Sequence, residues 1–107
     1  MKYFVFASML FAAPLLSQSV DGKELYDKNC KECHGAAGTP AKITFIKFPR
    51  IVRFDSAFVA THSVDSIVKI LIKGKNDNMI SFHRDLTDNE MTALAQYIRK
   101  LGSRKRS

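Results

Sequence analysis

The sequence has few of the residues that stabilise or anchor a small protein. Its 107 residues include two cysteines, no tryptophan, five glycines and three prolines. Two cysteines allow one disulfide at most, which excludes a disulfide-rich scaffold, and a four-ligand zinc site is not expected because no second Cys-x-x-Cys or spaced histidine pair follows the first. The longest charge-free apolar run, Tyr3–Leu16, is shorter than the about 20 residues of a membrane-spanning helix. What is left is one small domain whose core needs added stability from a single disulfide, a metal or a cofactor.

The N-terminal segment has the pattern of a secretory signal peptide. Lys2 supplies the positive charge, Tyr3–Leu16 the apolar region, and Ser17–Ser19 the small residues that a signal peptidase reads. We expect cleavage after Ser19, export to the periplasm, and a mature domain of residues 20–107. An uncleaved membrane anchor is the alternative.

The chain is basic, with 17 Lys and Arg against 10 Asp and Glu and a formal charge of +7. An excess of positive charge steers a protein toward acidic partners, most strongly at low salt. Nucleic acid is not expected as a partner, because an exported protein would not meet it. The basic tail Arg104–Arg106 is either a solvated end that aids solubility or part of a docking surface.

The segment Cys30-Lys31-Glu32-Cys33-His34 is the most informative motif. Two cysteines three residues apart lie on the same side of a helical turn, where both can form thioethers to the vinyl groups of one haem. The histidine that follows is placed to bind the iron. This is the attachment pattern of c-type haem, and it uses both cysteines.

A thiol–disulfide exchanger is the main rival interpretation of this motif. Such proteins also use Cys-x-x-Cys, but they place it after a strand in a βαβ unit. Here a short helical pattern, Lys23–Lys31, precedes the motif, and a glycine-containing loop, Gly35–Gly38, follows it. The flanks therefore favour haem attachment over thiol chemistry.

With these residues the chain resembles the class I c-type cytochromes, specifically the small single-haem periplasmic kind found in bacteria. Cys30, Cys33 and His34 match the attachment residues of that family. Met79 matches its distal methionine, in the loop before the final helix. The resemblance implies one covalent haem c with His34 and Met79 as the axial ligands of the iron.

The resemblance extends to the crossing of the first and last helices. Gly22 and Tyr26 stand eight and four residues before Cys30, where the family places a small residue and an aromatic. Leu94 and Tyr97 fall where the last helix carries their partners. We expect Gly22, which lacks a side chain, to let the two helices approach closely.

Local patterns predict an all-α fold with three main helices at about 22–31, 63–73 and 87–101. Ser63 is a typical N-cap, and Thr87 with Glu90 forms a capping box. Gly74 and Gly102 are expected to end the second and third helices. Apolar residues at helical spacing predict the buried faces: Val64, Ile67, Val68, Leu71 and Ile72 on the second, and Met91, Leu94, Ala95, Ile98 and Leu101 on the third.

Residues 35–62 form a long connection that is rich in aromatic and aliphatic residues. A structureless loop of this length is uncommon in a compact domain, so we expect it to wrap around the haem. A pair of strands is the alternative for this β-rich run. Lys42, Lys47, Arg50 and Arg53 are interleaved with the apolar residues, which departs from the family pattern and leaves partner docking or membrane proximity open for Lys42–Arg53.

Met79 is the candidate distal ligand because it lies in the polar loop Lys75–Phe82. A thioether is soft and neutral and stabilises ferrous iron, which raises the reduction potential. Met91 fits a core position instead, while His62 and His83 are competing ligands or ordinary surface histidines.

The family also implies that a proline carbonyl orients the proximal histidine. Metal-bound histidines usually donate their second ring N–H to a carbonyl or a carboxylate. Pro40 is the candidate for this role, with Pro49 as the alternative.

The predicted function is electron transfer without catalysis, and no catalytic residue is assigned. The partners implied are acidic redox proteins, such as a membrane cytochrome complex, a terminal oxidase or a peroxidase. The protein itself is predicted to be a monomer that does not span the membrane. The alternative is a haem protein with an open distal site that acts as a peroxidase or gas sensor; it gains if the Met79 sulfur does not bind iron.

Overall fold

The computed structural model describes residues 20–75 and 79–104, which contain helices α3 to α8 and no strand. The backbones of Lys75 and Met79 form one isolated bridge. The expected signal peptide and Lys105–Arg106 of the basic tail lie outside the described residues. No helix in the described ranges is long and apolar enough to cross a membrane.

The first predicted helix consists of two helices, α3 (Gly22–Asn29) and α4 (Lys31–His34), separated at Cys30. The Asp21 carboxylate accepts hydrogen bonds from the backbone N–H groups of Lys23 and Glu24 and so caps α3. The backbone N–H of Cys30 still donates to the Tyr26 carbonyl at 2.8 Å, which ends α3, and a new turn then begins. The predicted first helix is therefore confirmed as α3, and α4 follows it as a separate turn.

The other two predicted helices are confirmed as α7 (Val64–Lys73) and α8 (Asp88–Ser103). The Ser63 hydroxyl accepts from the Ser66 N–H, and Gly74, with φ of 79°, follows the last residue of α7. Thr87 and Glu90 form the expected capping box at the start of α8. All five residues predicted for the buried face of α8 are buried, whereas on α7 only Ile67 and Leu71 are fully so.

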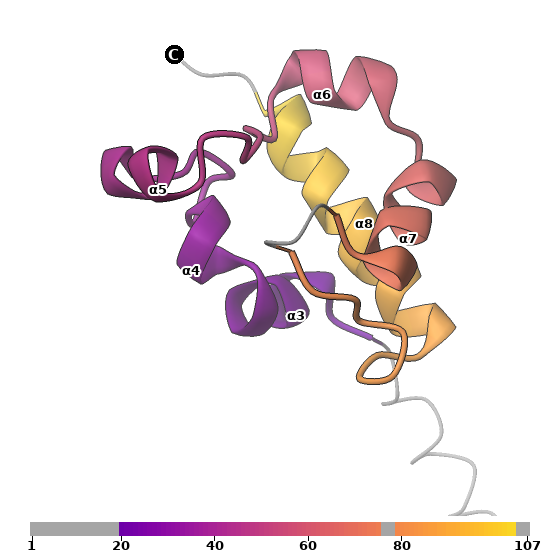
Figure 1. Cartoon of the computed structure of the whole chain (residues 1–107). Coiled ribbons are helices and arrows are strands. Elements are labelled where there is room, and N and C mark those ends of the chain that lie inside the picture. The colour runs from indigo at the N-terminus through magenta and orange to yellow at the C-terminus, as the bar shows by residue number, and fades with distance from the viewer. Residues whose placement is uncertain (1–19, 76–78, 105–107) are drawn as a thin grey trace, which may run out of the picture.

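The crossing of α3 and α8 forms the centre of the fold (Figure 1). A Cβ atom on Gly22 would lie 2.3 Å from the Ala93 carbonyl oxygen and 3.0 Å from the Tyr97 Cβ, so only glycine fits here. The Tyr26 and Tyr97 rings are tilted against each other at 5.3 Å, and Leu94 is fully buried. The predicted close approach is confirmed, with Ala93 rather than Leu94 nearest to Gly22.

Residues 35–62 contain two short helices, α5 (Lys42–Lys47) and α6 (Ser56–Thr61), and no strand, so the alternative of a strand pair was wrong. The expectation that this connection wraps around the haem stays a prediction. The Asp55 carboxylate accepts from the Phe58 N–H at 3.0 Å and caps α6. An aspartate before a short apolar run is a typical N-cap signal, and the dense aromatic pattern masked it.

Gly102 does not end α8 as predicted but lies inside it, buried against α6. A Cβ at this position would meet the Val59 Cγ2 at 2.5 Å and the Asp55 carbonyl oxygen at 2.8 Å. The glycine is therefore needed for the close approach of α6 and α8. Arg99 supports the same junction, because its Nη1 donates to the backbone carbonyls of Val59, at 2.9 Å, and His62.

The helices do not contribute equally to the core. Helices α3, α6 and α7 all pack against α8, whereas α5 packs against no other helix of the described part to a similar extent and lies at one edge (Figure 1). The buried core joins residues from most of the chain: Tyr26, Cys30, Phe54, Ile67, Leu71, Phe82, Leu86, Met91, Leu94, Ala95, Ile98 and Leu101.

Candidate haem site

The site begins at the short helix α4, which presents the two cysteines differently. Cys30 precedes α4 and is buried in the core, while Cys33 is exposed, and both thiols are free. The backbone N–H groups of Cys33 and His34 both donate to the Cys30 carbonyl, at 3.2 and 2.9 Å. These bonds keep Cys30, Cys33 and His34 on one tight turn, as attachment of a single haem requires.

His34 is held in a half-buried position by an aromatic neighbour. Its ring stacks on Phe54 with centroids 4.4 Å apart and planes inclined by 19°. Burial lowers the pKa of His34, and an interaction with the Val52 backbone partly offsets this effect. The ring is therefore biased toward the neutral form, which is the form that binds metals.

The Nδ1 atom of His34 is buried and has no hydrogen-bond partner among the described residues. A buried polar atom without a partner is uncommon and indicates a group that is to be satisfied by something else. Neither Pro40 nor Pro49 provides the carbonyl bond that the resemblance implied.

Tyr26 connects α3 to the residue that follows the histidine. Its side chain is fully buried, and its hydroxyl donates a 2.6 Å hydrogen bond to the Gly35 carbonyl. Gly35 has φ of 84°, and a Cβ there would lie 2.2 Å from the Thr39 carbonyl oxygen. The bond and the glycine together fix the direction in which the chain leaves α4.

Met79, the predicted distal ligand, is half-buried against the core cluster that includes Cys30. Its backbone pairs with Lys75 through two hydrogen bonds of 3.1 Å. Gly74, in a left-handed conformation, makes this possible, because a Cβ there would lie 2.7 Å from the Met79 carbonyl oxygen. The backbone of Met79 is thus well held, while the rest of its loop, residues 76–78, lies outside the described residues.

The other side chains considered as iron ligands already have contacts that explain their positions. Met91 is almost fully buried in the core on α8, as predicted. The His62 ring stacks on Phe58 at 4.0 Å, and its Nδ1 lies 3.1 Å from the Phe58 carbonyl oxygen. His83 is exposed, with its Nδ1 3.0 Å from the Ser81 hydroxyl.

The donor set fits covalent haem better than the other chemistries of cysteine. Burial, with a smaller contribution from the nearby Cys33, raises the pKa of Cys30 to about 12. A thiol-exchange cysteine needs the opposite shift, because its thiolate is the nucleophile. In the described ranges no group of three or more His, Cys, Asp or Glu side chains is arranged to hold a metal ion.

Phe54 is the residue of this site that the sequence did not single out. It packs edge-on against Tyr26 at 6.3 Å and against Phe58 at 5.0 Å, in addition to its stacking on His34. Its backbone N–H donates to the Gly38 carbonyl at 2.9 Å. The aromatic richness of residues 35–62 signalled an apolar partner for the haem site, but not which ring would reach the histidine.

Known proteins resemble the chain both in sequence and in structure. Residues 18–98 match the family described as cytochrome C oxidase, cbb3-type, subunit III. The solved structure of the KustC0563 c-type cytochrome is 30% identical, with a TM-score of 0.68 over 77% of this chain and 98% of that one.

A structure of the same cytochrome with one tyrosine changed to phenylalanine is 29% identical, with a TM-score of 0.67 over 77% of this chain and 99% of that one. No curated protein sequence matches the chain significantly. The matched family covers most of the chain and includes the whole α4 turn and Met79. The chain therefore belongs to this family of small class I c-type cytochromes, and it is a haem electron carrier with covalently bound haem c.

Proposed function

We propose that the protein is a periplasmic carrier with a single haem, held by thioethers from Cys30 and Cys33 and by axial bonds from His34 and Met79. Haem c supplies a reversible one-electron change between ferrous and ferric iron. The residues of the chain hold and orient the group and shield it from water. No residue is assigned a catalytic role.

The observation that carries the proposal is the state of His34. Its buried Nδ1 lacks a partner, its pKa is lowered by burial, and it directly follows a turn that carries two free thiols. A neutral imidazole in this setting is prepared for a metal without first losing a proton. The stacked Phe54 limits the rotation of the ring, which favours a defined ligand geometry.

Met79 is the proposed distal ligand because its backbone is fixed and its side chain packs on the same core as Cys30. Exposed His83 would have to leave its contact with Ser81 before it could bind iron. His62 would likewise have to leave its stack on Phe58. A methionine ligand favours ferrous iron and raises the potential, which suits a carrier between respiratory partners. The predicted signal peptide supports the periplasmic location, and the basic charge supports acidic partners.

The test is the absorption spectrum of the holoprotein, made with haem-attachment machinery, in the ferric and ferrous states. We expect covalent low-spin haem with the weak long-wavelength band of sulfur bound to ferric iron. Met79→Leu should abolish this band and give a high-spin ferric spectrum. Met91→Leu is the matched control, since it changes a core methionine and should leave the band in place.

Three results would contradict parts of the proposal. A high-spin ferric spectrum of the unchanged protein would indicate an open iron site and favour the ligand-binding or peroxidase alternative. A low-spin spectrum that survives Met79→Leu would assign the distal position to another residue. Free thiols and no haem under the same conditions would leave only thiol chemistry.

A further inference from the structure

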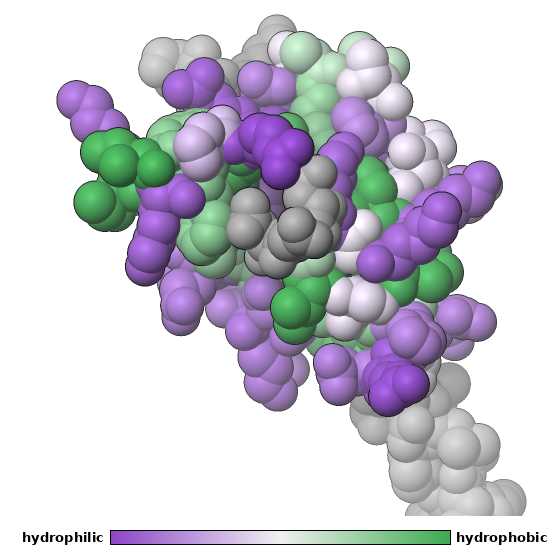
Figure 2. Space-filling model, in the orientation of Figure 1, coloured by the Kyte–Doolittle hydropathy of each residue, from purple (hydrophilic) through white to green (hydrophobic). Residues whose placement is uncertain are grey.

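Helix α5 exposes its apolar residues instead of burying them. The side chains of Ile43 and Ile46 have relative exposures of 67% and 75%. These are the highest values among the exposed large apolar residues of the described chain. They lie three residues apart and therefore share a face of the helix. Figure 2 shows this apolar surface at the edge of the molecule that α5 forms in Figure 1.

Lysines border the isoleucines on both sides. At about 100° per residue, the order around the helix is Lys42, Ile46, Ile43 and Lys47, so the two isoleucines lie between the two lysines. All four side chains are exposed, whereas Thr44 and Phe45 on the opposite side are half-buried. We call these four residues the α5 patch.

The surroundings of the patch extend its positive charge. Arg50 and Arg53 follow α5, and no acidic residue occurs between Glu32 and Asp55. The Arg53 guanidinium lies over the Phe45 ring, 5.0 Å from its centroid, which holds one of these charges against the inner side of α5. Val52 adds further exposed apolar surface to the same segment.

From this arrangement we propose that the α5 patch docks the cytochrome on the surface of an anionic phospholipid membrane. Exposed aliphatic residues between lysines are the pattern of a helix that lies in the headgroup region, with its apolar side chains in the acyl boundary and its charges on the lipid phosphates. The helix is short, so the contact is reversible and does not span the bilayer. The proposal does not depend on which residue is the distal ligand.

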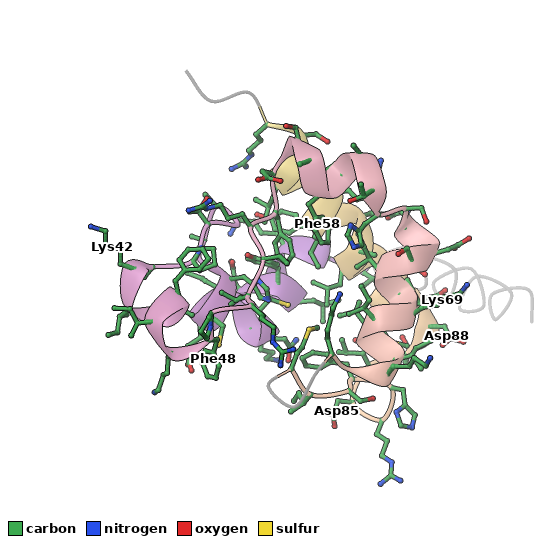
Figure 3. All side chains as sticks on the ribbon, turned by 45° about the horizontal axis from the view of Figure 1, so that its top comes forward. Lys42, Phe48, Phe58, Lys69, Asp85 and Asp88 are labelled. Atoms are coloured by element: carbon green, nitrogen blue, oxygen red, sulfur yellow. The ribbon has the colours of Figure 1, made fainter. Side chains whose placement is uncertain are left out.

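A membrane is favoured over an acidic protein by the shape and position of the patch. Helix α5 lies at one edge, and no other described helix packs extensively against it, so a flat surface can reach it. Figure 3 shows Lys42 and Lys69 projecting from opposite sides of the molecule, so a surface that meets Lys42 does not meet Lys69.

The test is sedimentation of the haem-loaded protein with vesicles of phosphatidylcholine alone or with added phosphatidylglycerol, followed by haem absorbance. We expect binding that needs phosphatidylglycerol and weakens with salt. Lys42→Gln with Lys47→Gln should reduce the affinity by about fivefold per lysine. Ile43→Ser with Ile46→Ser should reduce it by about tenfold or more, because the inserted apolar surface is lost.

The controls are on α7, away from the patch. Lys69→Gln with Lys73→Gln removes the same charge, and Ile72→Ser removes an isoleucine that is 38% exposed; both should leave binding within about twofold. The haem spectrum and melting temperature of each variant show that it is folded. The proposal would be overturned if the protein did not bind anionic vesicles. It would also be overturned if the α7 controls lost as much affinity as the patch variants, or if the isoleucine changes had no effect. Patch variants that keep vesicle binding but slow electron transfer to an acidic redox protein would overturn it too, because the patch would then be a protein-docking surface.

Discussion

The Tyr26 hydroxyl donates a hydrogen bond to the carbonyl of Gly35, nine residues further along the chain and directly after His34. Tyr26 stands on α3, against α8, and Gly35 ends the turn that carries the attachment residues. One buried side chain thus joins the helix crossing to the haem site. A change in the helix crossing is therefore expected to alter the haem site, and a change in the haem site to alter the crossing.

Replacing Tyr26 with phenylalanine tests this connection. The ring packing is kept, but the buried Gly35 carbonyl loses its donor, so the free energy of unfolding should fall by about 1–2 kcal/mol. Denaturant titration of the holoprotein measures the loss. Tyr97→Phe is the control, because its hydroxyl makes no hydrogen bond within the described part of the chain. An equal loss in both variants would contradict a specific role for the Tyr26 bond.

The same residue predicts a dependence of stability on alkaline pH. Burial raises the pKa of Tyr26 well above its usual value of 10.0. In the unfolded chain the phenol loses its proton near pH 10, while in the folded protein it retains it, so stability should fall as the pH rises above about 10. Tyr26→Phe should remove this part of the alkaline loss, as melting curves between pH 9 and 11 would show. An unchanged pH slope in the variant would contradict the prediction.

Gly22→Ala tests the closest contact between α3 and α8. The new Cβ would overlap the Ala93 carbonyl oxygen, so the helices must separate, at an expected cost of about 1–3 kcal/mol in the free energy of unfolding. Alanine is otherwise the better helix former, which makes a loss here informative. Lys28→Ala, at an exposed position of the same helix, should change stability by less than about 0.5 kcal/mol. A stabilised Gly22→Ala protein would show that the crossing is looser than described.

Arg99→Met tests the junction of α6 and α8. The variant keeps much of the side-chain packing but removes the donor of the Val59 and His62 carbonyls, and we expect a loss of about 1.5–3 kcal/mol in the free energy of unfolding. Thermal and denaturant unfolding measure it. The neighbouring Lys100→Met is the control, since its side chain is exposed and makes no described bond. Similar stability of the two variants would indicate that water replaces the arginine.

Thr87→Ala removes one half of the capping box at the start of α8. The Glu90 N–H would lose its acceptor, and the helix that covers α3, α6 and α7 should lose about 1 kcal/mol. Asn89→Ala, in the same turn but outside the box, is the matched comparison. Amide exchange at the start of α8 should accelerate in Thr87→Ala alone, and protection equal to that of the unchanged protein would contradict the role of the cap.

The parts of the fold that local chemistry determines could be predicted from the sequence. Ser63, Thr87 and Glu90 define helix starts through bonds to residues within three positions, and the apolar stripe of α8 follows from spacing alone. The attachment turn is also local, because its residues are adjacent. The same patterns placed three helices where they are found.

What could not be predicted depends on partners far away in the sequence. Glycine is typical of a helix end, so Gly102 was predicted to lie there. Its position inside α8 is instead required by the close contact with α6, more than forty residues earlier. Phe54 resembles the other aromatics of its segment until the fold brings it against His34. The outward-facing isoleucines of α5 contradict the usual burial of such residues, and no local rule indicates this.

The attachment segment precedes α8 by a long stretch of chain, and this order has a consequence for biosynthesis. The face of α3 that carries Tyr26 is covered by α8, and the two helices are separated by the whole of residues 30–87. While the chain is being made, the first helix cannot complete its packing until α8 has emerged. Cys30 is buried only after this assembly, so both thiols remain open to the attachment machinery during a period set by the order of the chain itself.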